Sequence, residues 1–188
     1  MVMAASPTEW TADMLDDVPD DGRRWEVIDG LLLVTPGPDV PHQLVVGEIH
    51  FRLYGCFGRL AGARLIASPS DVRRGPKTRM QPDLFVVRMR DGKLPAYPFD
   101  MGELLLTIEV VSPSSAKVDR HARRRAYLGG GVPEYWVVDA DAQRIERWRT
   151  GDERPELCTD SITFHAAGLD GPLTISLPEL FADASRGL

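Results

Sequence analysis

Cysteine is scarce in this chain. Its two cysteines, Cys56 and Cys158, lie far apart in the sequence, so they provide neither a paired zinc-ligand spacing nor a disulfide framework. We expect both to be buried thiols in a reducing cytoplasm. No apolar run approaches the ~20 residues of a membrane span, and residues 1–6 lack the basic and apolar regions of a secretion signal. These absences predict a cytoplasmic protein with no membrane partner.

Positive charge is also in short supply. The 22 lysines and arginines face 28 aspartates and glutamates, which gives a net charge of -6. This balance argues against bulk electrostatic attraction to nucleic acid, but it leaves room for a local basic groove or a metal ion in an acidic site. The length of 188 residues suits one domain with a sizeable core. We expect a single domain over residues 1–188, with a short helix and an acidic connector in 1–20 and an irregular packed tail in 150–188.

The apolar pattern alternates between strands and helices along the chain. Asp29-Gly30 lies between the apolar runs 25–28 and 31–34, which predicts a two-residue hairpin. Apolar spacing predicts helices over 8–15 and 42–54, another from Ser114 or Ser115 to about 128, and a weak one from Pro178. The predicted strands are 64–73, 80–89, 104–111, 134–138 and 143–149, with short ones near Ile162 and Leu173. Strands interleaved with helices indicate one α/β domain with a mixed sheet.

Two carboxylates interrupt otherwise apolar segments. Asp83 follows Pro82 in the 80–89 strand, and Glu109 lies inside the 104–111 strand. An unpaired charge in such a place costs several kcal/mol, so a shared Mg²⁺ or Mn²⁺ is the simplest explanation if the strands are neighbours. Without metal, we expect the two carboxylates to repel each other. Metal-held carboxylate pairs are typical of phosphodiester-cleaving sites, although Val111 stands where a lysine is expected two residues after Glu109.

The helix after Glu109 offers a cation for the same site. Asp119, Arg123 and Tyr127 are spaced four apart and therefore share one helix face. Arg123 is the best placed candidate to stabilise charge on an attacked phosphate. Its competitors are Lys117, Arg120 and Arg124. The alternative is a solvated basic helix in which Arg123 simply pairs with Asp119.

Five further polar residues are candidates for this site. Glu48, on the first long helix, could be a third metal ligand or a water-orienting group, or could belong to a solvated face. Asp71 could contact metal or substrate, or be an edge-strand polar residue, and Glu26 could line the same cleft. His42 could contact phosphate or water, or cap the helix. Arg79 belongs to a basic turn that either steers a polyanion toward the metal or is a solvated loop.

Short motifs follow one another in a distinctive order. The most specific pair is Glu109-Val110-Val111-Ser112-Pro113-Ser114 joined to Glu134-Tyr135-Trp136-Val137-Val138-Asp139. The other segments are Glu26-Val27-Ile28-Asp29-Gly30, His42-Gln43, Ser70-Asp71-Val72-Arg73, Gln81-Pro82-Asp83, Asp119-Arg120 and Tyr127. From about Trp10 to Trp148, this order resembles the Uma-type putative restriction endonuclease family, a branch of the PD-(D/E)XK nuclease superfamily.

The resemblance implies a restriction-endonuclease-like mixed central sheet flanked by helices. It implies that Asp83 and Glu109 are metal ligands, helped by the main-chain carbonyl of Val110. It further implies that the motif lysine has moved to the following helix, to position 123, where this chain has arginine. Arginine stays protonated and cannot be a general base, but it can hold a phosphate bidentately.

Three functions are consistent with this sequence. The leading hypothesis is an endonuclease that uses Mg²⁺ or Mn²⁺ to hydrolyse phosphodiester bonds in DNA. The first alternative is a catalytically impaired nucleic-acid-binding or regulatory module of the same fold. The second is a metal-dependent hydrolase of another phosphate ester, since fold does not fix substrate. Homodimer formation, a common solution for nucleases that cut both strands, stays open.

Overall fold

A computed structural model describes residues 9–57, 62–111, 119–165 and 172–187 of the chain. Its centre is a six-stranded sheet of order β11-β10-β9-β8-β6-β3, in which β8 and β9 are parallel and the other neighbours are antiparallel. The strands of this sheet are β3 Ala63–Ala67, β6 Leu84–Arg88, β8 Leu104–Val111, β9 Glu134–Asp139, β10 Arg144–Arg149 and β11 Glu156–Cys158.

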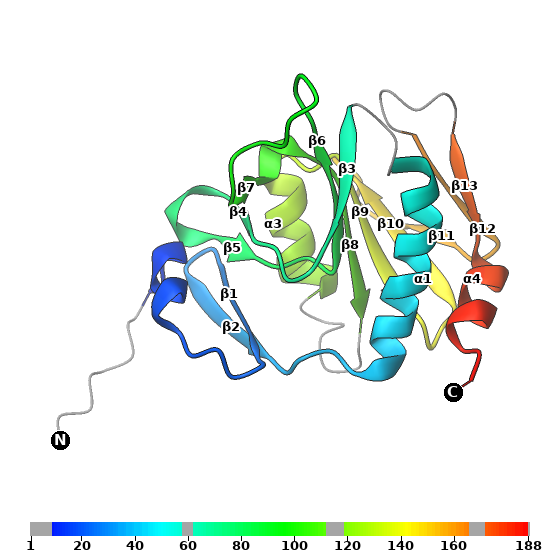
Figure 1. Ribbon diagram of the computed structural model, residues 1–188, viewed down its shortest axis with the longest axis horizontal. Helices are drawn as coiled ribbons and strands as arrows, with labels where there is room; N and C mark the ends of the chain where they lie inside the picture. The colour runs from blue at the N-terminus through cyan, green and yellow to red at the C-terminus, as the bar shows by residue number, and fades with distance from the viewer. Residues whose placement is uncertain (1–8, 58–61, 112–118, 166–171, 188) are drawn as a thin grey trace.

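A second, five-stranded sheet of order β2-β1-β5-β4-β7 lies beside the first (Figure 1). Its strands are β1 Arg24–Ile28, β2 Leu31–Thr35, β4 Val72–Arg73, β5 Arg79–Met80 and β7 Phe99–Asp100, and a two-stranded sheet pairs β12 Ser161–Phe164 with β13 Leu173–Ser176. The helical segments are η1 Ala12–Asp17, α1 Val40–Phe57, η2 Gly75–Lys77, η3 Met101–Glu103, η4 Asp119–Arg123, α3 Arg124–Gly129 and α4 Leu177–Ala184. These elements confirm the predicted α/β class with a mixed sheet.

The six-stranded sheet is buried on both faces, which explains its long apolar runs. Alternate residues of one strand point to opposite faces. In β8, Leu106, Ile108 and Val110 belong to the core cluster beneath α1 and α4. The same cluster contains Trp136 of β9, whereas its neighbour Tyr135 belongs to the second cluster, on the α3 side. Glu109 therefore points away from α1 and toward α3, as this alternation requires.

The chain passes repeatedly between the two sheets, and two of these crossings, from β3 to β4 and from β5 to β6, divide a predicted strand. Residues 64–73 form β3 in one sheet and β4 in the other, and residues 80–89 form β5 and β6. Pro69 and Pro82 lie at the crossings, where a residue without a backbone N–H cannot continue a ladder. Asp83 is therefore not inside a strand, as the sequence suggested, but in the crossing immediately before β6.

Other predictions differ from the structure in extent. The hairpin at Asp29-Gly30 is confirmed, with φ of 50° and 83° at the two turn residues, as a primed turn requires. The helix expected over 8–15 is the 3-10 helix η1, and α1 extends beyond 42–54 at both ends. The helix after Glu109 is described from η4, a π-helical segment, onward. Its expected start at Ser114 or Ser115, with Lys117, lies outside the described residues.

The described residues of 150–188 form regular elements, unlike the irregular tail expected there. It supplies β11 to the large sheet, the predicted strands near Ile162 and Leu173 as β12 and β13, and α4, which packs beside α1. Apolar residues at spacings of three and four bury α4: Leu177, Leu180, Phe181 and Ala184. Cys158 is buried, as predicted, whereas the side chain of Cys56 lies outside the described part of the chain. Within the described ranges, no helix has the length and apolarity that a membrane crossing requires.

Candidate active site

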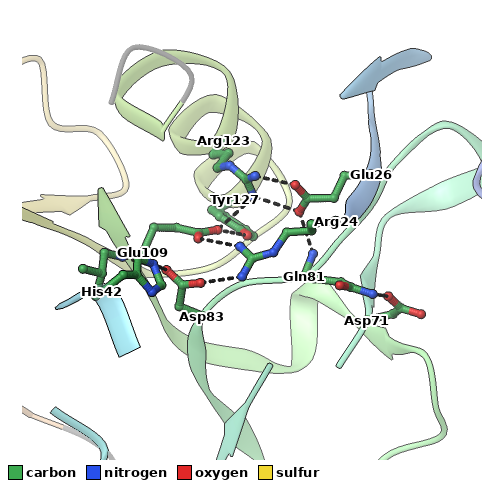
Figure 2. A network of polar contacts seen from close by, with 10 residues as sticks. Arg24, Glu26, His42, Asp71, Gln81, Asp83, Glu109, Arg123 and Tyr127 are labelled. Carbon is green, nitrogen blue, oxygen red and sulfur yellow. Dashed lines mark hydrogen bonds and ion pairs between the residues drawn. The ribbon is translucent and has the colours of Figure 1, made fainter. Parts of the chain in front are cut away.

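Side chains from six segments converge where the two sheets and α3 meet (Figure 2). Strand β1 contributes Arg24 and Glu26, the first turn of α1 contributes His42, and the crossing before β6 contributes Asp83. The remaining three are Glu109 of β8, Arg123 of η4 and Tyr127 of α3. The structure thus brings together both carboxylates of the predicted metal site and the arginine predicted to assist them.

Asp83 is 2% exposed and accepts hydrogen bonds on both oxygens. Its Oδ1 lies 2.7 Å from Arg24 Nη2, and its Oδ2 lies 3.1 Å from His42 Nε2 and 2.8 Å from the backbone N of Val110. Burial alone would raise the pKa of Asp83, but the hydrogen bond with His42 and the charge of Arg24 outweigh it and lower that pKa to about 2. Asp83 is therefore ionised at neutral pH.

Glu109 is also 2% exposed and is held mainly from the helix side. Its Oε1 accepts hydrogen bonds from Tyr127 Oη at 2.7 Å and from Arg123 Nη1 at 3.1 Å. Burial raises the pKa of Tyr127 well above its ordinary value, and the negative charge of Glu109 raises it further. Tyr127 is thus a neutral donor to Glu109. The spacing of four between Arg123 and Tyr127 places both on this carboxylate, as expected for one helix face.

Arg123 is buried between two glutamates. Its guanidinium is bidentate on Glu26, which is fully buried, and its Nη1 lies 2.8 Å from Glu26 Oε1. Only 2% of Arg123 is exposed, so its position is fixed from several sides. Glu26 also accepts a hydrogen bond from the backbone N of Gln81 at 2.7 Å. Arg123 therefore orients Glu109 and does not face solvent.

Arg24 is the residue that sequence reasoning missed, and it touches both predicted metal ligands. While Nη2 donates to Asp83, Nη1 lies 3.7 Å from Glu109 Oε2. Burial lowers the pKa of Arg24, but the charges of Asp83, Glu109 and Glu26 raise it more, so this guanidinium stays charged. Arg24 thus offsets the repulsion between the two carboxylates that the sequence hypothesis assumed for the metal-free protein.

A second polar cluster lies on the other side of Gln81. Asp71 is 4% exposed and accepts from Arg79 Nε at 2.9 Å, Arg79 Nη2 at 2.6 Å, Tyr97 Oη at 3.0 Å and Gln81 Nε2 at 2.8 Å. Arg79 also donates to Asp16 Oδ1 at 2.5 Å. Asp71 and Arg79, both predicted near the substrate, thus bind each other instead of joining Asp83.

The remaining candidates lie elsewhere. Glu48 pairs with Arg52, whose other nitrogen donates to Asp183 of α4 at 2.7 Å, and it makes no described contact with Asp83 or Glu109. Arg120 donates to Glu146 and Asp139, both at 2.7 Å, so its guanidinium is engaged by these two acids instead of by Asp83 or Glu109. The basic turn around Arg79 is neutralised by nearby acids. Its pairs are Arg73 with Asp13, Arg74 with Asp29 and Lys77 with Glu9.

An open pocket of about 350 Å³ adjoins the carboxylates. Asp83 and Arg24 line it together with Gln43, Gln81 and Ser68, whereas neither Glu109 nor Arg123 does. A volume of this order suits a small polar ligand or one unit of a polymer. The pocket therefore gives a substrate access to Asp83 and Arg24 first.

The donor set fits a hard divalent cation in chemistry and charge. Asp83 and Glu109 offer carboxylate oxygens, which Mg²⁺ and Mn²⁺ prefer, and both already lie on one positive group, Arg24. Among the described residues, no three histidine, cysteine, aspartate or glutamate side chains are grouped as a complete metal cage. A cation here would draw its other ligands from the backbone, water or substrate, and it would need the place that Arg24 now takes.

A mixed sheet covered by helices, with one carboxylate from its central strand and one from the crossing beside it, defines a protein of restriction-endonuclease-like fold. The chain belongs to the Uma2 family, described as "Putative restriction endonuclease", whose model matches residues 12–186. The fold resembles the crystal structure of a putative nuclease belonging to DUF820 from Anabaena variabilis, with a TM-score of 0.75 and 21% sequence identity over 93% of this chain and 99% of that one. No curated protein matches the chain. Family and fold were thus both predicted from the sequence.

Proposed function

We propose that this protein is a divalent-metal-dependent endonuclease that hydrolyses phosphodiester bonds in DNA at the pocket beside Asp83. The observation that carries this proposal is the convergence of Asp83 and Glu109, from separate segments, on a single cationic group next to an open pocket. Two carboxylates that share one cation attract a divalent ion more strongly than they attract a monovalent side chain.

Asp83 and Glu109 would hold Mg²⁺ or Mn²⁺, with the carbonyl of Val110 as the predicted third ligand. When bound, such an ion supplies Lewis acidity that favours attack of water on phosphorus. His42 orients Asp83 through its Nε2, and the backbone N of Val110 fixes the same carboxylate from β8. Arg123 and Tyr127 hold Glu109, so Arg123 is a positioning residue rather than a group that touches the phosphate.

The test is a cleavage assay on supercoiled plasmid with Mn²⁺ or Mg²⁺, paired with calorimetric titration of Mn²⁺. We expect the parent to cleave and to bind the ion, and Asp83→Ala to lose both. Asp141→Ala, at an exposed turn carboxylate, is the matched control and should behave like the parent. Mn²⁺ binding that survives in Asp83→Ala would refute the assigned site. Cleavage of small phosphate esters without plasmid cleavage would favour a different phosphate ester as substrate.

One observation favours a second candidate, a nucleic-acid-binding or regulatory module without turnover. Arg24 and Arg123 compensate the buried carboxylates without any metal, so the persistence of these acids does not by itself require an ion. In that case, the parent would bind DNA but leave plasmid intact with every divalent ion tried. DNA binding by the parent without Mn²⁺ binding would favour the nucleic-acid-binding or regulatory module.

A further inference from the structure

We propose that Arg24 is the substrate-facing cation of this site: it bridges Asp83 and Glu109 in the resting protein and moves to a phosphate in the adjoining pocket when a divalent ion takes the carboxylates. This inference rests on the proposed metal-dependent function and assigns a residue that neither the motif pattern nor the helix spacing indicated. Arg24 would then have the role that the sequence predicted for Arg123, which is to stabilise negative charge on the phosphate.

The two arginines differ in how firmly they are held. Arg123 makes hydrogen bonds to both Glu26 and Glu109, and its side chain is 2% exposed. Arg24 has one hydrogen bond to a side-chain carboxylate, at 2.7 Å to Asp83, and a longer contact of 3.7 Å to Glu109, and its side chain is 14% exposed. A long flexible stem lets an arginine head group move without displacing its strand. Arg24 is therefore the guanidinium of the two that can leave.

Charge explains why it would leave. Counted at formal charges with His42 neutral, Glu26, Asp83 and Glu109 together with Arg24 and Arg123 carry one net negative charge. A divalent ion added to this group would reverse that sign and place a second cation within contact distance of Arg24, where like charges repel strongly. Moving the guanidinium away from the carboxylates removes this repulsion. The ion and Arg24 thus compete for the same two carboxylates.

The pocket gives the displaced guanidinium a destination. Arg24 already lines this pocket of about 350 Å³, beside Asp83, Gln43 and Gln81. A phosphodiester brings a negative charge and paired oxygens that match a guanidinium bidentately. Phosphate bound there would lie next to Asp83, where the proposed ion acts. Arg24 therefore links metal binding to substrate binding through one change of partner.

The first experiment is calorimetric titration of Mn²⁺ into the parent, Arg24→Gln and Arg90→Gln. Arg90 is an exposed arginine that pairs with Glu103 at the surface, and its variant should match the parent. We expect Arg24→Gln to bind Mn²⁺ at least about tenfold more tightly, because a competing cation is gone. Equal affinity in the parent and Arg24→Gln would overturn this inference while leaving the proposed function standing. No binding by either protein would overturn both.

The second experiment measures binding of a short duplex with cleavage-resistant phosphorothioate linkages. With saturating Mn²⁺, Arg24→Gln should bind the duplex at least about tenfold more weakly than the parent, whereas in chelator the two should differ little. An equal loss with and without metal would mean that Arg24 does not change partners, and would overturn the inference.

The third experiment takes its readout from the parent protein, and a conservative variant serves only to assign one resonance. In the parent, Mg²⁺ is titrated while the arginine Nε–H resonances are followed by NMR, and Arg24→Lys identifies the resonance of Arg24. We expect that resonance to shift or to exchange faster with solvent as Mg²⁺ binds, while that of Arg123 moves less. An Arg24 resonance that does not respond at saturating Mg²⁺ would contradict the exchange.

Discussion

Two buried arginine–carboxylate clusters lie on either side of Gln81, and they are built differently. Around Asp71, a single carboxylate accepts four side-chain hydrogen bonds, and Arg79 also forms an ion pair with the exposed Asp16. Around Asp83, three buried carboxylates share two arginines, and one of these, Arg24, spans two acids beside an open pocket. The Asp71 carboxylate is saturated by four side-chain donors, whereas Asp83 and Glu109 share a single arginine, Arg24, whose place a metal ion could take.

This comparison shows how an ion-pair cluster that only stabilises the fold differs from a candidate functional site. Burial, ionised groups and close arginines occur in both clusters, so none of these features alone identifies chemistry. Both clusters also line a pocket, of about 180 Å³ at Asp71 and about 350 Å³ at Asp83. What distinguishes the Asp83 cluster is that its acids come from β1, the crossing before β6 and β8, and that two of them share one arginine. Gln81 joins the two clusters by donating its backbone N to Glu26 and its side chain to Asp71.

The largest effect on stability is expected from Arg123→Ala. This change leaves Glu26 and Glu109 buried without the arginine that compensates them, and breaking such a buried group typically costs about 3–5 kcal/mol. Denaturant unfolding in chelator should show a loss of this size. The exposed Arg125→Ala, two positions along the same helical segment, is the control and should change stability little. A loss below about 1 kcal/mol would mean that Arg123 does not hold this site together.

A smaller loss of stability is expected from Asp71→Asn and from Asp83→Asn, and the two variants should differ in how Mn²⁺ changes their stability. In chelator, both should lower the free energy of unfolding by about 1–3 kcal/mol, because each carboxylate accepts hydrogen bonds from charged donors. Saturating Mn²⁺ should stabilise Asp71→Asn as much as the parent, by about 2.7 kcal/mol at a hundredfold excess over Kd. It should not stabilise Asp83→Asn. The same metal response in both variants would erase the proposed distinction between the clusters.

Much of the fold was predictable because local signals were strong. Asp29-Gly30 fixed the hairpin, and the apolar run 104–111 identified the central strand. The crossings from β3 to β4 and from β5 to β6 were missed because the apolar pattern was read as continuous through Pro69 and Pro82. A proline inside a central strand argues against such a strand. Those prolines were the available signal for the place where Asp83 lies.

The site was predictable where partners share one helix or a motif, and unpredictable where they meet only through the fold. Arg123 and Tyr127 reach Glu109 from one helix face, which spacing revealed. Arg24 meets Asp83 across 59 positions because β1, in one sheet, passes beside the crossing into the other. No local pattern encodes that contact, and two adjacent arginines at 23 and 24 look alike in sequence.

The smallest effect is expected in alkaline solution, from the saturated cluster. Tyr97 is 60% exposed, but its hydroxyl donates to the buried Asp71; partial desolvation of this hydroxyl and the negative charge of Asp71 raise the pKa of Tyr97 above its ordinary value of 10, an effect that solvent keeps small. A raised pKa in the folded state means that the stabilisation is complete below pH ~10 and is lost as pH rises through the folded pKa. Tyr97→Phe has no hydroxyl to ionise, so its stability should fall less steeply than that of the parent above pH ~10. Thermal unfolding between pH 8 and 11 (roughly the range in which phenols titrate) measures this slope. Tyr54→Phe, at an exposed tyrosine that stacks on His50, is the control and should retain the slope of the parent. If Tyr97→Phe and the parent decline in parallel, Asp71 is not held through Tyr97, and the saturated cluster depends on Arg79 and Gln81 alone.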